Sequence, residues 1–265
     1  MFADYHVHSH FSEDTDFPME LEIQKAIKLG MDELCFTEHS DYDVPTVVNC
    51  DYDAYFEEME KMKDKYKGQI TLKTGIEFGI QTHTTKAYEE TFRQYPFDFV
   101  IGSIHLIHGQ DPYYRGFFEG RSDEEAYHEA FQVAIENLKK INSFDSLGHL
   151  DYVVRYGAHQ AEEYSYRKYA EEIDEILKHL ISHGKGLEMN MAGMKYGLGF
   201  PNPHPDVIRR YKELGGEIVT IGADAHRPEH VAFDYEQAGE ILAGCGFSYY
   251  AEFKGRKPVF RRIVP

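Results

Sequence analysis

The regular alternation of strand-like and helix-like segments is the feature that most constrains the fold of this chain. Short runs rich in β-branched and aromatic residues alternate with longer segments of helical periodicity, and we find no linker, repeat or low-complexity tract between them. This alternation predicts a parallel βα array, either a barrel or a doubly wound sheet. The seven expected strands are residues 2–8, 33–39, 71–79, 98–105, 146–152, 186–190 and 217–226.

Residues that start and stop helices support the segments between these strands. The first helical segment begins at Pro18 and is followed by Gly30, the usual asymmetry of helix ends. Ser122 and Glu125 form a capping-box pattern at the start of another. The expected helices are residues 18–29, 51–66, 85–95, 122–141, 164–183, 205–214 and 235–243.

The choice between barrel and sheet rests on length and on the first strand. A chain of 265 residues fits one large α/β barrel or two small domains. No GxGxxG or Walker loop follows the first strand, which disfavours a nucleotide-binding sheet. We therefore expect an α/β fold with one domain over residues 1–265. In a barrel the catalytic groups lie at the carboxyl ends of the strands.

Histidines and carboxylates recur at those expected strand ends. A single histidine near a strand end is more often structural, but here only the sixth strand lacks the pattern. Imidazole and carboxylate are the ligands that Zn²⁺, Mn²⁺ and Fe²⁺ accept. The recurrence therefore predicts a cluster of two or three divalent metal ions (Zn, Mn, Fe or Co), with Glu77 placed to bridge. The residues in question are His6, His8, Glu38, His39, Glu77, His105, His149, Asp151, Asp224 and His226.

The composition narrows the partners and the compartment. With 46 acidic and 28 basic residues the formal net charge is −18, which disfavours nucleic acid and anionic membranes as partners. An anionic substrate would then need a local positive centre, which bound metal ions can supply. The three cysteines are widely spaced, so we expect neither a disulfide framework nor a zinc ribbon, and a cytoplasmic location. The sequence leaves the oligomeric state open.

The strand-end motifs resemble those of the polymerase and histidinol phosphatase (PHP) superfamily. That family shows an HxH, a TEH, a GxE, a GSxH, a GHxD and a late DAH, and all six occur here in order across residues 6–226. The segments at residues 4–12, 75–79, 105–114 and 193–197 are similar to the histidinol-phosphate phosphatase branch. The resemblance implies a distorted (β/α)7 barrel with a trinuclear metal site.

The resemblance also implies which residues bind each ion. Some family members have a histidine in the loop after the first strand, where this chain has Asp14 beside Glu13. A carboxylate there remains a competent metal ligand. The implied sets are His6, His8, Glu77 and Asp224 for the first ion, Glu77, His105 and His149 for the second, and His39, His226 and Asp14 for the third.

Ligand chemistry and resemblance together predict hydrolysis of a small phosphate monoester. Water bridging two cations loses a proton near neutral pH, and the hydroxide would attack phosphorus. The resemblance implies L-histidinol phosphate as the substrate, giving L-histidinol and phosphate in histidine biosynthesis. We expect Glu77, Asp224 and His226 to be catalytic, and the proton for the leaving alkoxide could come from a metal-bound water, Asp224 or His226.

Three basic residues are candidates for binding the phosphate. In the branch that the chain resembles, basic residues after the fifth and sixth strands do so; here they are Arg155 and Lys195, the second a departure from the usual arginine. Arg227, beside His226, is a third candidate. Acidic and aromatic residues near the pocket could receive the ammonium and imidazole groups, among them Asp111, Tyr113, Tyr114 and Glu119.

Three alternatives stay open at this point. The same chemistry could serve another phosphate ester, such as a nucleotide, a sugar phosphate or a phosphotyrosine peptide. The chain could be an exonuclease module like those of DNA polymerases, which its acidic charge disfavours. It could also be a non-catalytic metal-binding module, which the intact ligand set disfavours.

Overall fold

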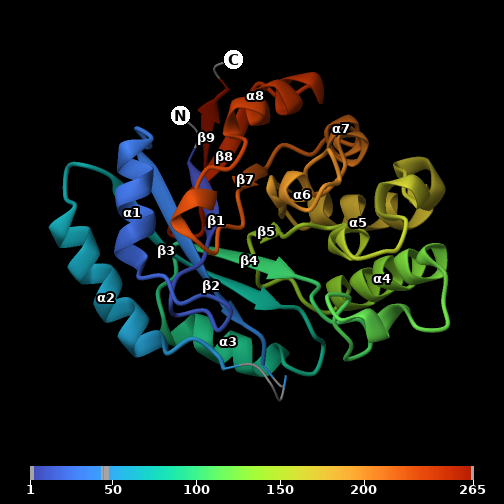
Figure 1. The fold of residues 1–265 in the computed structure, drawn as a ribbon, viewed down its shortest axis with the longest axis horizontal. Coiled ribbons are helices and arrows are strands. Elements are labelled where there is room, and N and C mark those ends of the chain that lie inside the picture. The colour runs from blue at the N-terminus through green and yellow to red at the C-terminus, as the bar shows by residue number, and fades with distance from the viewer. Residues whose placement is uncertain (1–2, 43, 45–47, 264–265) are drawn as a thin grey trace.

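Seven parallel strands form one sheet in which every strand lies beside its neighbours in the sequence. The computed structural model describes residues 3–42, 44 and 48–263. Figure 1 shows the strands at the centre of the molecule with helices around them. The strands are β1 (Asp4–Val7), β2 (Glu33–Ser40), β3 (Thr71–Gly79), β4 (Phe99–Ser103), β5 (Ser146–Leu147), β6 (Gly186–Asn190) and β7 (Val219–Gly222).

The sheet closes on itself between β1 and the segment after β7. His8 N donates to the carbonyl of Ala225 at 2.8 Å, and Ala225 N donates to the carbonyl of His6 at 3.2 Å. Hydrogen bonds therefore run around the ring, although β5 contributes only two residues to it. The predicted distorted (β/α)7 barrel is confirmed.

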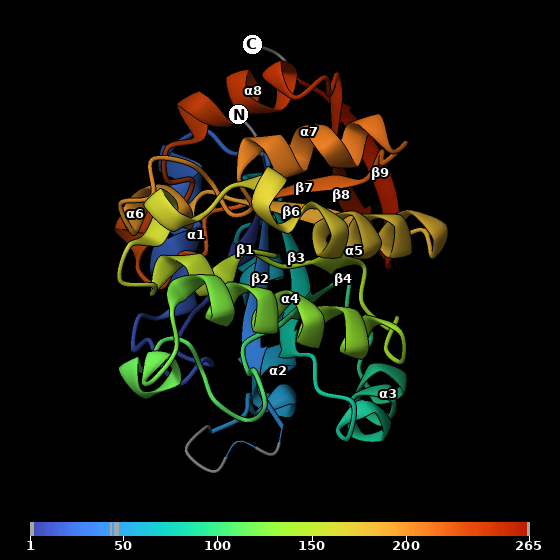
Figure 2. The ribbon, with the colours of Figure 1, turned by 90° about the vertical axis from the view of Figure 1, so that its right-hand side faces the viewer.

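The helices pack against the outside of the barrel through their apolar faces. In α4, Ser122 and Glu125 form the predicted capping box, with Ser122 N donating to the Glu125 carboxylate at 2.8 Å. In Figure 2, α4, α5 and α7 lie side by side across one face of the molecule. The α-helices are α1 (Met19–Lys28), α2 (Tyr52–Lys65), α3 (Thr85–Gln94), α4 (Asp123–Leu138), α5 (Ala170–Ser182), α6 (Ala192–Lys195), α7 (Pro205–Glu213) and α8 (Tyr235–Gly244). Short 3₁₀ turns are η1 (Arg115–Phe118), η2 (Tyr152–Arg155), η3 (Gln160–Glu163), η4 (Tyr166–Tyr169) and η5 (Pro228–His230).

Five of the seven expected strands differ in their bounds from the observed ones, namely 2–8, 33–39, 98–105, 146–152 and 217–226. The first residue expected in the first strand, Phe2, lies outside the described residues. The fifth strand stops at Leu147, and the chain then passes so close to β4 that a Cβ on Gly148 would lie 2.2 Å from Ser103 Oγ. The seventh stops at Gly222 because Asp224 adopts a left-handed backbone conformation, with φ of +54°.

A β-hairpin that the sequence analysis missed closes the amino end of the barrel. Strands β8 (Tyr249–Lys254) and β9 (Lys257–Arg262) pair antiparallel across Gly255 and Arg256, which both have positive φ as a type I′ turn requires. Phe253 of β8 packs on Phe99 and Tyr5, with ring centroids 4.7 and 6.4 Å away. The hairpin therefore gives the barrel interior an apolar floor.

The β1–β2 register shifts between Asp4 and Val7, as at a β-bulge. Because of this shift, two successive side chains of β1 make contacts inside the barrel. Tyr5 packs into the apolar floor, and His6 approaches the carboxylate of Glu77. The interior thus has an apolar layer at its amino end and a polar layer at its carboxyl end.

Among the described residues, no helix combines the length and the apolar character that a membrane crossing requires.

A buried carboxyl group in α1 gives a stability prediction. Glu22 is fully buried, and its two oxygens have no hydrogen-bond partner. Burial, with the nearby carboxylates of Glu38 and Glu229, raises the pKa of Glu22 to about 8. The native state therefore holds a proton that the unfolded chain releases above its ordinary pKa of 4.5. Stability should fall as the pH rises through this window, by about 1.4 kcal/mol per pH unit for one group.

Replacing Glu22 by Gln should remove that contribution. The free energy of unfolding is compared between wild type and Glu22→Gln at each pH. We expect the difference, wild type minus variant, to decrease as the pH rises from 5 to about 8, with the slope for one proton. Urea unfolding at several pH values, at a constant metal concentration, measures the difference. Parallel pH profiles for the two proteins would show that Glu22 does not carry the proton.

Candidate metal centre

The carboxylate of Glu77 lies at the centre of the polar layer, fully buried on β3. Its Oε2 is 3.1 Å from His6 Nε2 of β1 and 3.1 Å from His39 Nδ1 of β2. Its Oε1 is 3.0 Å from His149 Nε2, after β5, and 3.2 Å from His105 Nε2, after β4. One carboxylate therefore faces imidazoles from four separate parts of the barrel.

A second carboxylate, Asp224, enters from the segment after β7. Its Oδ1 lies 3.7 Å from His6 Nε2 and 3.6 Å from His8 Nε2. The side chain of His8 is also 3.6 Å from Glu77 Oε2. Both members of the predicted HxH pair thus point between Glu77 and Asp224.

Asp14 joins the outer side of the cluster. Its Oδ2 lies 2.8 Å from His226 Nε2 and 3.6 Å from His39 Nε2, and these two ring nitrogens are 3.3 Å apart. The neighbouring Glu13 points elsewhere, because its Oε2 accepts a hydrogen bond from Val48 N at 2.7 Å. Of the two adjacent carboxylates, Asp14 is therefore the one that faces the histidines.

Several atoms at the centre are buried and lack hydrogen-bond partners. They are His6 Nε2, His8 Nε2, His39 Nδ1 and Glu77 Oε2. Buried polar atoms without partners are rare and unfavourable in folded proteins. These atoms converge on one volume, and imidazole nitrogens with carboxylate oxygens are the donor set of Zn²⁺ and related ions. The residues present therefore fit divalent metal ions.

Four groups of three residues have ligand atoms close enough to hold an ion, all within 4.8 Å of one another in each group. The groups share members, as ligands in a multinuclear centre do. They are His8, His39 and His226; His6, His8 and Glu77; His6, His149 and Asp224; and His39, Glu77 and His105.

The electrostatics at the centre agree with this interpretation. Although burial opposes the shift, the carboxylates of Glu188, Glu77 and Asp224 raise the pKa of His6 well above its usual value. Burial likewise opposes the shift at Glu77, but the surrounding histidines lower the pKa of this carboxyl well below its usual range. Each carboxylate is therefore stabilised by positive charge, which bound cations would also provide.

Two further carboxylates, missed by the sequence analysis, hold the outer nitrogens of the histidines. Asp41 Oδ1 lies 3.0 Å from His105 Nδ1, and Glu188 Oε1 lies 2.5 Å from His6 Nδ1. Such partners fix the orientation of a ligand imidazole and raise its basicity. Asp41 lies two residues after His39 of the TEH motif and just past the end of β2, and nothing in the sequence indicates its contact with His105.

Arg155, a predicted phosphate-binding residue, is buried against Asp224. Its Nη1 lies 3.1 Å from Asp224 Oδ2, its Nε donates to Asn202 Oδ1 at 2.8 Å, and its Nη2 donates to Asn190 Oδ1 at 3.1 Å. A guanidinium has five N–H donors. These contacts use three of them, and the ring of Tyr196 lies 4.9 Å from the guanidinium carbon.

The other two basic candidates differ in position. Lys195 Nζ donates to the carbonyls of Ala223 and Asp224, each at 2.9 Å, and burial lowers its pKa to about 8. Arg227 is exposed in the loop after β7. The structure thus brings Arg155 and Lys195 to Asp224 but leaves Arg227 on the surface.

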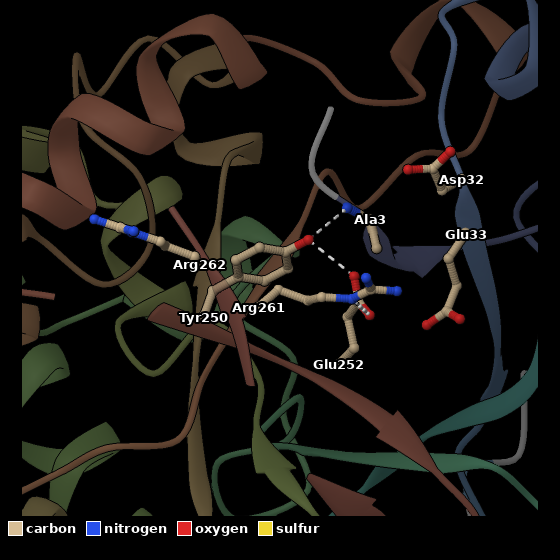
Figure 3. Close-up of a pocket in the computed structure, with 7 residues that line it drawn as sticks. All are labelled: Ala3, Asp32, Glu33, Tyr250, Glu252, Arg261 and Arg262. Carbon is tan, nitrogen blue, oxygen red and sulfur yellow. Dashed lines mark hydrogen bonds and ion pairs between the residues drawn. The ribbon is translucent and has the colours of Figure 1, made fainter. Parts of the chain in front are cut away.

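A separate crevice of about 250 Å³ lies at the opposite, amino end of the barrel. Figure 3 shows its residues, among them Glu252, whose carboxylate accepts from Tyr250 Oη at 2.9 Å and from Arg261 Nε at 2.6 Å. Glu252 is thus already paired, and among the described residues none that lines the crevice is a histidine. The cluster of histidines and carboxylates around Glu77 lies at the other end of the barrel.

Comparisons with known proteins agree on one family. Residues 4–192 match the PHP domain family. The chain is 32% identical over 262 residues to a histidinol-phosphatase of Lactococcus lactis, covering 96% of this chain and 95% of the relative. It is 30% identical over 262 residues to a probable histidinol-phosphatase of Clostridium acetobutylicum, covering 98% and 96%.

Solved structures give the same result. The L. lactis histidinol phosphate phosphatase, crystallised with zinc, L-histidinol and phosphate, superposes with a TM-score of 0.89 over 97% of this chain and 98% of that one, at 32% identity. A putative histidinol phosphatase of Listeria monocytogenes superposes with a TM-score of 0.77 at 20% identity, over 89% and 99% of the two chains. This second likeness bears on the fold alone.

The adjacent carboxylates Asp14 and Glu13 allow a matched test of the outermost ion. We expect Asp14→Ala to bind about one metal ion fewer per chain than wild type, because its carboxylate faces His39 and His226. Glu13→Ala should keep the wild-type metal content, because that side chain bonds to Val48 N instead. Elemental analysis after equilibration with limiting zinc checks both variants. Equal metal content in the two would contradict a role for Asp14 as a ligand.

Proposed function

We propose that this chain, which belongs to the PHP domain family, is a metal-dependent phosphatase that hydrolyses L-histidinol phosphate to L-histidinol and phosphate. The observation that carries the proposal is the convergence of unpartnered imidazole nitrogens on Glu77 inside the barrel. The substrate comes from the 32% identity, over nearly the full length of both chains, to the L. lactis enzyme and its complex with zinc, L-histidinol and phosphate.

The ligand sets implied by the sequence resemblance become the proposed metal sites. Glu77 would be shared by two ions, which its contacts with both His6 and His149 support. Asp14 completes the outermost site, which its distance of 2.8 Å from His226 supports. The proposed ligands are His6, His8, Asp14, His39, Glu77, His105, His149, Asp224 and His226.

Two basic side chains are suited to hold the phosphate beside that centre. Divalent cations, once bound, would activate a water molecule for attack and neutralise phosphoryl oxygens. Arg155 is held rigidly by its three contacts and keeps two N–H donors for the phosphate. Lys195 is fixed by two carbonyls and keeps one donor. Glu77, Asp224 and His226 would surround the reacting group.

The mouth of the site is suited to a leaving group that carries positive charge. Asp111 accepts hydrogen bonds from Tyr152 Oη at 3.2 Å and from Tyr113 N at 2.8 Å, so its carboxylate has a fixed position. The rings of Tyr113 and Tyr114 are exposed nearby. A carboxylate flanked by tyrosines can bind an ammonium or imidazolium group by charge and by cation–π contact.

The proposal extends to the setting in which the enzyme works. A substrate of this kind is a soluble metabolite, and a chain of net charge −18 is poorly suited to nucleic acid or an anionic membrane. We place the enzyme in the cytoplasm, with a small phosphate ester as its partner and residues 1–265 as one domain.

Removing the metal tests the function directly. We expect chelator-treated protein to lose its activity on L-histidinol phosphate, and Zn²⁺, Mn²⁺, Fe²⁺ or Co²⁺ to restore it, because metal-bound water loses a proton near neutral pH and free water does not. Release of phosphate should be compared across L-histidinol phosphate, a nucleotide, a sugar phosphate and phosphotyrosine. Full activity without metal would refute the mechanism, and a higher kcat/KM for a rival ester would refute the substrate.

Arg155 and Arg227 provide a matched pair for the phosphate-binding role. Arg155→Ala should lower kcat/KM by ~10–10³-fold, in the range expected for a charged hydrogen bond made in the transition state. Arg155→Lys should recover part of this loss, since a point charge replaces the planar fork. The exposed Arg227→Ala should change kcat/KM by less than about twofold. Metal content is measured for every variant, and wild-type kinetics in metal-loaded Arg155→Ala would contradict the assignment.

A further inference from the structure

Among the barrel strands β1–β7, β6 is the one whose end carries no proposed metal ligand. Its last two inward side chains are nevertheless polar and buried: Glu188 is 1% exposed and Asn190 is 0% exposed. They lie two residues apart, so they share one face of the strand. Glu188 contacts the proposed ligands His6 and His149, and Asn190 contacts Asp224 and the phosphate-binding candidate Arg155.

Glu188 determines which nitrogen of His6 faces the centre. Its Oε1 lies 2.5 Å from His6 Nδ1, and an ionised carboxylate can only accept a hydrogen bond. The proton of a neutral His6 must therefore be on Nδ1, which leaves the lone pair on Nε2. That lone pair lies 3.1 Å from Glu77 Oε2, and a cation held by both atoms would replace the repulsion between them with attraction.

Glu188 is itself held firmly at its second oxygen. Its Oε2 accepts from the backbone N of His149 at 2.8 Å and from Asn190 Nδ2 at 3.2 Å. The first bond ties the carboxylate to the segment that carries another proposed ligand. A single carboxylate thus fixes the relative position of His6 and His149.

The backbone leaves room for this pair at one glycine of β7. A Cβ on Gly222 would lie 2.4 Å from Glu188 Oε1 and 2.4 Å from His6 Cβ, closer than side-chain atoms approach one another. Any larger residue would push the carboxylate and the imidazole out of place. The requirement for glycine here is an independent sign that the contact between Glu188 and His6 determines the local packing.

Asn190 extends the arrangement to the phosphate-binding side. Its Oδ1 accepts from Arg155 Nη2 at 3.1 Å, and its Nδ2 lies 3.3 Å from Asp224 Oδ2. The end of β6 therefore contacts a proposed ligand through each residue, although it supplies none itself.

We propose that Glu188 is a positioning residue of the metal centre: it holds His6 with Nε2 directed at the ion and sets the geometry of His6 relative to His149. This inference rests on the proposed metal centre but not on the identity of the phosphate ester. Carboxylate partners of ligand histidines typically contribute 10- to 100-fold in metal affinity.

The test is a zinc titration of metal-free protein against a chromophoric chelator. Glu188→Gln keeps the size of the side chain but removes its charge, and we expect zinc affinity to fall by about 10- to 100-fold. Gly222→Ala should weaken zinc binding in the same direction, because it displaces the same pair. Glu252→Gln is the control: this carboxylate is 7% exposed and hydrogen-bonded, but lies at the other end of the barrel. Its zinc affinity should stay within about twofold of wild type.

Thermal unfolding of the metal-free proteins separates positioning from general stability. Wild-type zinc affinity in Glu188→Gln, with a lowered Tm, would overturn the proposal and leave Glu188 a purely structural residue. The titration uses no phosphate ester, so it stands apart from the proposed function. Zinc binding by wild type without phosphatase activity would overturn the function alone.

Discussion

The burial of the Glu77 carboxylate among imidazoles is the interaction on which the rest of the structure depends. An isolated charge inside a protein costs several kcal/mol, so this carboxylate requires positive partners from all sides. Those partners come from segments far apart in the sequence, and they meet only if the sheet closes. The hydrogen bonds that Ala225 makes with His6 and His8 are therefore part of the site, because they bring the start of the barrel to its end.

Much of this arrangement could be predicted from the sequence, because two regular patterns carry it. The alternation of strands and helices predicts the number and order of barrel strands, and the side-chain alternation along a strand predicts which residues face inward. The groups behind the histidines could not be predicted in the same way. Glu188 and Asp41 are ordinary carboxylates in the sequence, and only the folded positions of His6 and His105 show what they contact.

Two errors in the expected elements have local causes. The fifth strand is short because the chain turns after Gly148, where the carbonyl of His149 accepts from Tyr152 N at 2.7 Å and leads into η2. The β8–β9 hairpin was missed because it follows the last helix and forms its own two-stranded sheet, outside the repeating pattern. The aromatic residues before Gly255, at Tyr249, Tyr250 and Phe253, and the glycine itself were the available signal.

The hairpin floor also bears on when a nascent chain can assemble its polar layer. Tyr5 and Phe99 are synthesised early, but the side chain that covers them, Phe253, is made after all seven barrel strands. Until then the amino end of the barrel exposes aromatic surface to water, which favours rearranged or aggregated states over a closed ring. We therefore expect the closed ring, and with it the cluster of histidines and carboxylates, to form only after β8 has been synthesised.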